Sequence, residues 1–154
     1  LEDGDVDGVY TVVKPALHEF ASITFEDVCR EFVREMQKQN MLPFRYSKMG
    51  RWTGKTTLRD KTAKNGLRIA ETEIDLLCID QKGENYMVGE CKFKKEPFTY
   101  TEYLNTLSKL TPLKEKTQFY YALFSESGFD EKIVEDLKEN KTYIYTLSQI
   151  VNYK

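Results

Sequence analysis

Residues 73–93 read EIDLLCIDQKGENYMVGECKF, and the fold can be worked out from this stretch. Two apolar runs, Ile74 to Ile79 and Tyr86 to Phe93, are separated by a polar segment whose Gly83 marks a turn. Apolar runs of this length on either side of a glycine turn predict an antiparallel hairpin. Charged residues interrupt both runs, and they are the first candidates for a functional site.

Asp75 lies near the start of the first run, and Glu90 and Lys92 lie near the end of the second. Because side chains alternate along a strand, Glu90 and Lys92 share one face and Cys91 lies on the other. Pairing of the two strands can bring Asp75 beside Glu90, and two close carboxylates repel unless a cation lies between them. The pattern therefore indicates a divalent metal site, with Lys92 assisting the attacking water. An exposed ion pair between Glu90 and Lys92 on an ordinary hairpin is the alternative.

A helix is predicted over 24–39, where apolar residues recur at helical spacing and Thr24 can serve as the N-cap. At about 100° per residue, Glu26 lies on the shoulder of the apolar stripe, whereas Glu31 points away from it. Glu26 is therefore the acid of this helix that can face other elements. Residues 1–23 show no strong periodicity and are interpreted as a lead-in to one domain over 24–154.

The remaining elements predict a mixed central sheet flanked by helices, because strands and helices alternate with long crossovers. The expected order is helix, three strands, helix, strand, helix, strand. Outside the first helix and the hairpin, the expected elements are a strand at 44–46, a helix at 99–110, a strand at 118–124, a helix at 130–138 and a strand at 143–147.

The 154 residues are 40% apolar, which suits a single globular domain, and the net charge of -2 excludes a uniformly basic nucleic-acid coat protein. No apolar run approaches the roughly 20 residues of a membrane helix, and no export signal is visible, so a soluble cytoplasmic protein without membrane partners is expected. Cys29, Cys78 and Cys91 lie far apart and are expected to be reduced core residues. With His18 as the single histidine, zinc sites and histidine-based nucleophiles are not expected.

Positive charge is concentrated between Arg45 and Arg68, where eight basic residues and one acid give +7 while the rest of the chain carries -9. One interpretation is a surface that neutralises phosphates while Trp52 or Tyr46 contacts bases. The other is a solvated loop. In the first interpretation, the nucleic-acid-binding residues are Arg51, Trp52, Lys55 and Arg59.

The segment Gly50 to Thr56, GRWTGKT, is similar to a P-loop. However, a P-loop has four residues between its glycines, whereas this segment has three, and Met49 stands where the first glycine belongs. Nucleotide binding by this segment is therefore not expected.

Asp75, followed after the hairpin by Glu90-Cys91-Lys92, resembles the PD-(D/E)XK signature of restriction-endonuclease-like nucleases, and the expected element order is similar to their αβββαβ core. Five ordered blocks further resemble the nuclease-like domain at the C-terminus of a family of archaeal and bacterial AAA-type ATPases. These blocks are FEDVCREF at 25–32, GRWTG at 50–54, EIDLL at 73–77, GECKF at 89–93 and LFSESGF at 123–129.

The resemblance implies hydrolysis of DNA phosphodiesters that depends on Mg²⁺ or Mn²⁺. Asp75 and Glu90 would be metal ligands, Lys92 the catalytic lysine, and Glu26 the helix carboxylate that completes the metal or water site. It also implies an ATPase domain upstream in the same polypeptide, and the chain, which begins with Leu1, is expected to be a fragment of that polypeptide. The competing interpretation is a noncatalytic module of the same fold that binds DNA or a partner protein and couples it to the ATPase.

Overall fold

A computed structural model of the chain describes residues 6–110 and 115–152, with the side chains of residues 6–20, 22, 58 and 59 outside the description. Its elements are α1 (Val6–Lys38), β1 (Lys48–Arg59), β2 (Leu67–Ile79), β3 (Asn85–Lys92), α2 (Tyr100–Ser108), β4 (Gln118–Ser125), α3 (Glu131–Asp136), β5 (Thr142–Thr146) and α4 (Leu147–Val151). The mixed α/β class and the αβββαβ order expected from the sequence are confirmed, and the short helix α4 follows them.

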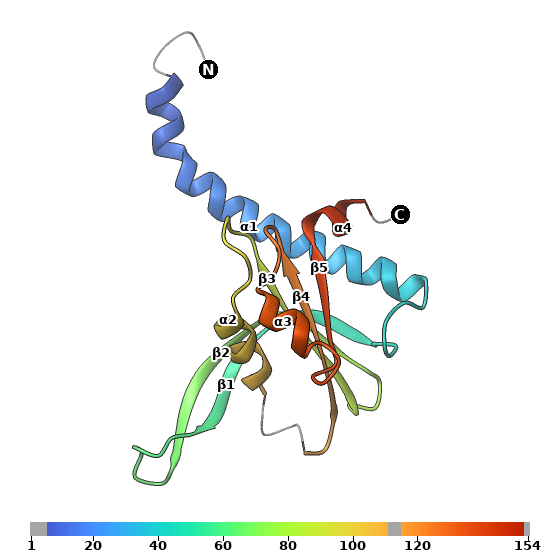
Figure 1. Cartoon of the computed structure of the whole chain (residues 1–154). Helices are drawn as coiled ribbons and strands as arrows, with labels where there is room; N and C mark the ends of the chain where they lie inside the picture. The colour runs from blue at the N-terminus through green and yellow to red at the C-terminus, as the bar shows by residue number, and fades with distance from the viewer. Residues whose placement is uncertain (1–5, 111–114, 153–154) are drawn as a thin grey trace.

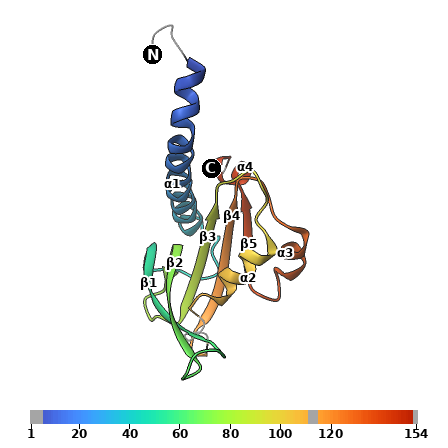
Figure 2. The same ribbon diagram turned by 90° about the vertical axis from the view of Figure 1, so that its left-hand side faces the viewer.

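The five strands form one mixed sheet in the order β1-β2-β3-β4-β5. β1, β2 and β3 are antiparallel neighbours, whereas β3 pairs with β4, and β4 with β5, in parallel. Parallel neighbours need a crossover, and α2 and α3 lie in the two crossovers. Figure 2 shows α1 on one side of the sheet and α2 and α3 on the other.

Each face of the sheet is covered by its own hydrophobic contacts. On one face, α1 buries Phe25, Cys29 and Phe32 against Leu76 and Phe124 of the sheet. On the other face, α2 and α3 pack through a cluster made by Phe98, Tyr103, Leu123 and Ile133. The strands between these layers are fixed from both sides, so the residues that end them have defined positions.

The ladder between β2 and β3 is short, while that between β1 and β2 is long. Pairing of β2 with β3 runs from Ile79–Tyr86 to Leu76–Gly89, whereas β1 and β2 remain paired as far as Arg59–Leu67. The outer parts of β1 and β2 therefore form a two-stranded arm that extends beyond the rest of the sheet (Figure 1). We call the point after Leu76–Gly89, where β2 leaves β3, the fork.

A β-bulge lies beside the fork. Gly50 pairs with Leu77 and Trp52 pairs with Ile74, so β1 has one residue where β2 has two. Bulges bend a strand and change the direction of its side chains, and they are frequent beside functional sites. This bulge includes Asp75, one of the acids singled out in the sequence.

Helix α1 starts at Val6, so the prediction that the helix begins at residue 24 is wrong, and Thr24 lies inside it. Figure 1 shows the first part of α1 beyond the sheet. Because this part of α1 does not pack on a core, it needs no apolar stripe, and the sequence periodicity therefore did not reveal it. The proposed domain boundary after residue 23 falls within this helix.

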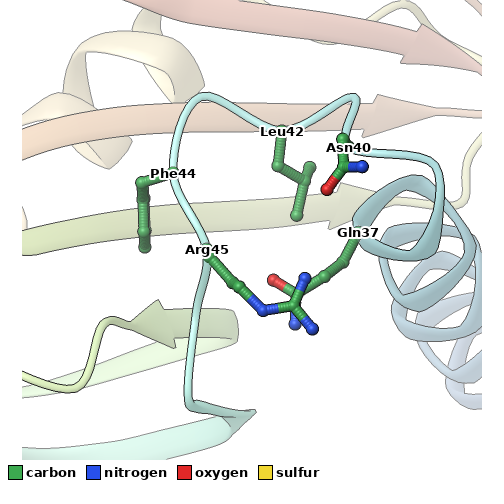
Figure 3. Close-up of a pocket in the computed structure, with 5 residues that line it drawn as sticks. All are labelled: Gln37, Asn40, Leu42, Phe44 and Arg45. Carbon is green, nitrogen blue, oxygen red and sulfur yellow. The ribbon is translucent and has the colours of Figure 1, made fainter.

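The predicted strand at 44–46 is also wrong, because β1 starts at Lys48. The Gln37 side chain takes the place of a neighbouring strand: its Oε1 accepts from the Tyr46 N–H at 2.9 Å, and its Nε2 donates to the Tyr46 carbonyl at 3.2 Å. Gln37, Leu42 and Phe44 line a small pocket beside this turn (Figure 3).

Two other expectations concern burial and membranes. Cys29, Cys78 and Cys91 are free thiols, the first two buried, and burial raises the pKa of Cys78 to about 12. In the part of the chain that the structure describes, no helix has the length and apolar character needed to cross a membrane. The side chain of His18 lies outside the described residues.

Substitution of Gly89 tests the close contact between β2 and β3 at the fork. A Cβ there would lie 2.9 Å from the Leu76 Cβ and 3.1 Å from the Leu76 carbonyl oxygen. We expect Gly89→Ala to lower the free energy of unfolding by about 1–3 kcal/mol, because the two strands must separate. Denaturant unfolding measures this. Gly50→Ala is the matched control, since its Cβ would meet no described heavy atom within 4 Å. Equal losses in the two variants would contradict the close packing.

Candidate active site

Asp75 connects the two strands at the fork. Its Oδ2 accepts a hydrogen bond from the Cys91 N–H at 2.9 Å, in place of the strand bond that ends one residue earlier. Arg30 of α1 donates from Nη1 to the Asp75 carbonyl oxygen at 2.9 Å. The Asp75 side chain therefore fixes the backbone of the Glu90-Cys91-Lys92 segment, and α1 fixes the backbone of Asp75.

Glu90 is buried and faces two ammonium groups. The Lys109 Nζ lies 2.7 Å from Glu90 Oε2, and the Lys92 Nζ lies 3.5 Å from Glu90 Oε1. Burial raises the pKa of Glu90, repulsion from Asp75 adds to the increase, and the two lysines oppose it. The raised pKa shows that the lysines do not fully compensate the burial of this carboxylate.

Glu26 reaches the site from the opposite face, on α1. Burial raises its pKa, and the Asp75 carboxylate raises it further by repulsion and by a side-chain hydrogen bond. Arg51 and Arg30 oppose this, with nitrogens 3.7 and 3.9 Å from Glu26 Oε2. The structure thus brings all three predicted acids together, with Asp75 interacting electrostatically with both Glu26 and Glu90.

A pocket of about 370 Å³ opens at the fork. Four acids, Glu71, Glu73, Asp75 and Glu90, line it together with Lys109. The rest of its wall comes from the arm and α2 and includes Thr56, Thr72, Asn105 and Ser108. Glu26 and Lys92 are not part of the wall. Glu26 interacts with Asp75, and Lys92 with Glu90, from outside it.

The donor atoms suit a hard divalent cation. Carboxylate oxygens are the ligands that Mg²⁺ prefers, and it commonly takes one or two of them together with water and phosphate oxygens. Among the described residues, no three Asp, Glu, His or Cys side chains are arranged as a ready metal site. The contacts explain this, because both Glu90 oxygens face lysines and Glu26 meets Asp75 from the α1 side. Asp75 and Glu90 are the pair that fits Mg²⁺, with Glu26 supporting Asp75.

The four candidate nucleic-acid residues have different positions. Arg51 lies in the bulge, half exposed, with its guanidinium near both Glu26 and Glu73. Trp52 is partly buried and packs against the cluster around Ile74. Lys55 is exposed on the arm. The side chain of Arg59 lies outside the described residues.

The P-loop-like segment is part of strand β1 and does not form a phosphate-binding loop before a helix. Gly54 is needed for another reason. A Cβ at this position would lie 2.5 Å from the ring of Trp52, so the glycine makes room for the indole.

Lys109 is the residue that the sequence did not reveal. It is the C-cap of α2, and its Nζ donates both to Glu90 and to the Glu73 carbonyl oxygen at 2.6 Å. A lysine at a helix end forms no motif. Only the placement of α2 over the sheet brings Lys109 to the acids, and the sequence gives no direct signal for that placement.

The fold and site define a mixed α/β domain with a carboxylate and lysine centre at a strand fork. The chain belongs to the DUF234 family of archaeal and bacterial proteins of unknown function, which matches residues 1–105. It is 27% identical over 90 residues to the uncharacterized protein MJECL04 of Methanocaldococcus jannaschii, a match that covers 57% of this chain and 17% of that protein. The chain therefore spans less than a fifth of the length of this relative.

Two solved structures are similar to the chain. The protein of unknown function AF1548 has 16% identity and a TM-score of 0.48, with 82% of this chain and 58% of that one covered. The MspJI restriction endonuclease in complex with a 27-mer oligonucleotide has 9% identity and a TM-score of 0.47, with 97% of this chain and 31% of that one covered.

The raised pKa of Glu26 predicts how stability depends on pH. An acid whose pKa is higher in the folded state than its ordinary 4.5 loses stability as pH rises from 4.5 through the raised pKa. Glutamine does not ionise, so we expect Glu26→Gln to unfold at higher denaturant concentration than the parent at pH 7, with the difference shrinking below pH 4.5. Glu31→Gln, on the exposed side of the same helix, is the control. A Glu26→Gln protein less stable than the parent at pH 7 would show that its arginine contacts dominate.

Proposed function

We propose that this chain is a nuclease domain of the restriction-endonuclease-like class that hydrolyses DNA phosphodiester bonds with Mg²⁺ or Mn²⁺. The observation that carries the proposal is the fork, where Asp75, Glu90 and Lys92 of the PD-(D/E)XK-like pattern lie together: Asp75 and Glu90 line one pocket, and the Lys92 Nζ is 3.5 Å from Glu90. Burial and mutual repulsion leave the pKa of Glu90 raised despite two lysines, which is the electrostatic condition that a bound divalent cation relieves.

In the proposed site, Asp75 and Glu90 hold the metal ion and Glu26 holds Asp75 in place. The ion supplies Lewis acidity to the phosphate and to the attacking water. Lys92 is positioned by Glu90, at 3.5 Å, and its partly exposed ammonium can orient that water or stabilise the negative charge that develops on the phosphate. Arg51, between Glu26 and Glu73, limits the repulsion among the acids on the α1 side.

The arm is the proposed track for DNA. The basic segment, +7 in total, runs from just before β1 through β1 and the turn after it to the start of β2, and its part from Lys55 to Arg68 lies on the arm. A two-stranded β-ribbon fits the major groove of DNA, and basic side chains on it would neutralise phosphates. The arm begins at the fork, so DNA that follows it would reach the acids.

The resemblance to the nuclease-like domain of AAA-type ATPases supports a further part of the proposal, an ATPase domain upstream in the same polypeptide. One observation favours the noncatalytic alternative, in which the domain only binds DNA or a protein for that ATPase. Both oxygens of Glu90 already have lysine partners, so the site is electrostatically balanced in part without a metal.

Three proteins separate cleavage from binding: the parent, Lys92→Ala, and a variant with Lys55, Lys61 and Lys64 changed to alanine. In Mg²⁺ we expect Lys92→Ala to cut plasmid DNA about 10²–10⁴-fold more slowly while its affinity for duplex DNA changes little. The triple variant should bind unrelated sequences more weakly, with the slope of log affinity against log salt reduced by about 0.9 for each lost phosphate contact.

The controls are Lys95→Ala for cleavage and alanine at Lys82, Lys116 and Lys138 for binding, all exposed lysines outside the arm. Parent protein that binds DNA but does not cut it in Mg²⁺ or Mn²⁺ would support the noncatalytic module. An unchanged salt slope in the arm variant would show that the arm is not the DNA track.

A further inference from the structure

We propose that Lys109 is an exchangeable cation of the site: it occupies the metal-binding oxygen of Glu90 in the metal-free protein and transfers to a substrate phosphate when a divalent ion binds. This inference rests on the proposed nuclease function and extends it to the coupling between metal and DNA.

The contacts of Lys109 show why it competes with a metal ion. Its Nζ lies 2.7 Å from Glu90 Oε2, and both side chains are largely buried, at 14% and 11% exposure. Glu90 is also one of four acids in the wall of the pocket, with Glu71, Glu73 and Asp75. An ammonium and a divalent cation both approach a carboxylate oxygen closely and repel each other, so they cannot share Oε2. Metal binding at Glu90 therefore requires Lys109 to move.

The second contact of Lys109 keeps it near the site after it leaves Glu90. Nζ also donates to the Glu73 carbonyl on β2, across the pocket from α2. A carbonyl oxygen is neutral and can keep one of the three ammonium protons while the others turn to a new acceptor. The backbone of Lys109 is fixed at the end of α2, where its N–H donates to the Thr106 carbonyl.

The pocket supplies a place for that new acceptor. Its wall carries uncharged hydroxyl and amide groups from Thr56, Thr72, Asn105 and Ser108. Lys109 is the one basic side chain among its described lining residues, beside the four acids. A phosphodiester that enters between the arm and α2 would meet these hydrogen-bond partners and this single ammonium, and the bound divalent ion would offset the repulsion from the four acids. Charge-assisted bonds from lysine to phosphate are among the stronger polar contacts. Lys109, once displaced from Glu90 by the metal ion, would therefore strengthen the binding of DNA.

Titration of Mn²⁺ into the chain by calorimetry, at fixed pH and ionic strength, measures the competition. We expect Lys109→Met to bind Mn²⁺ at least about tenfold more tightly than the parent, since the oxygen is no longer occupied, while Lys109→Arg, which keeps the charge, stays near the parent. Lys94→Met is the matched control, because Lys94 makes a 2.6 Å ion pair with Glu102 outside the pocket. Equal Mn²⁺ affinity in Lys109→Met and the parent would overturn the inference.

DNA binding gives the second readout, measured with a short duplex oligonucleotide in a Lys92→Ala background so that cleavage does not interfere. Mn²⁺ should strengthen DNA binding by the Lys92→Ala protein, and adding Lys109→Met should remove most of that gain even though the metal binds more tightly. A full gain in the double variant would overturn the transfer of Lys109 to phosphate. Absence of Mn²⁺ binding in the parent and in Lys109→Met alike would overturn the proposed metal site itself.

Discussion

The hydrogen bond from the Cys91 N–H to the Asp75 carboxylate is the constraint on which the site depends. Next to it, the β2–β3 ladder has ended, and β2 continues into the arm with β1 alone. A backbone N–H left by a departing strand needs another acceptor, and the first side chain beyond the ladder provides it. One bond therefore keeps the Glu90-Cys91-Lys92 segment extended, holds Asp75 beside Glu90 and fixes where the arm begins.

Ion pairs between side chains of different elements partly balance the charges around this bond. Lys92 and Lys109 face Glu90 from β3 and α2, while Arg30 and Arg51 face Glu26 from α1 and β1. The pKa values of Glu26 and Glu90 stay raised all the same, because burial outweighs these partners. The acids are thus held together by the fold against their own repulsion. Acids with raised pKa values in one pocket are candidates for a functional site, and the metal ion that we propose would relieve their repulsion.

Local patterns predicted the parts of the fold that depend on neighbouring residues. The alternation of side chains in 73–93 predicted the hairpin and placed Glu90 and Lys92 on one face of their strand. The apolar stripe along the predicted helix identified the buried face of α1 and the position of Glu26 beside it. The fork, the bulge at Asp75 and the approach of Lys109 depend on where strands and helices end relative to one another. The predicted strand at 44–46 is wrong because the Tyr46 backbone bonds the Gln37 side chain, nine residues earlier and near the end of α1, in place of a neighbouring strand.

Amide hydrogen exchange at Cys91, followed by NMR, tests the central constraint most directly. The Cys91 amide should exchange slowly in the parent and in Asp75→Asn, whose amide oxygen can still accept the bond. It should exchange much faster in Asp75→Ala, while amides within the β2–β3 ladder, such as that of Val88, remain protected. A Cys91 amide that exchanges at the same rate in Asp75→Ala as in the parent would contradict the account, because the fork would then be held by something other than the Asp75 carboxylate.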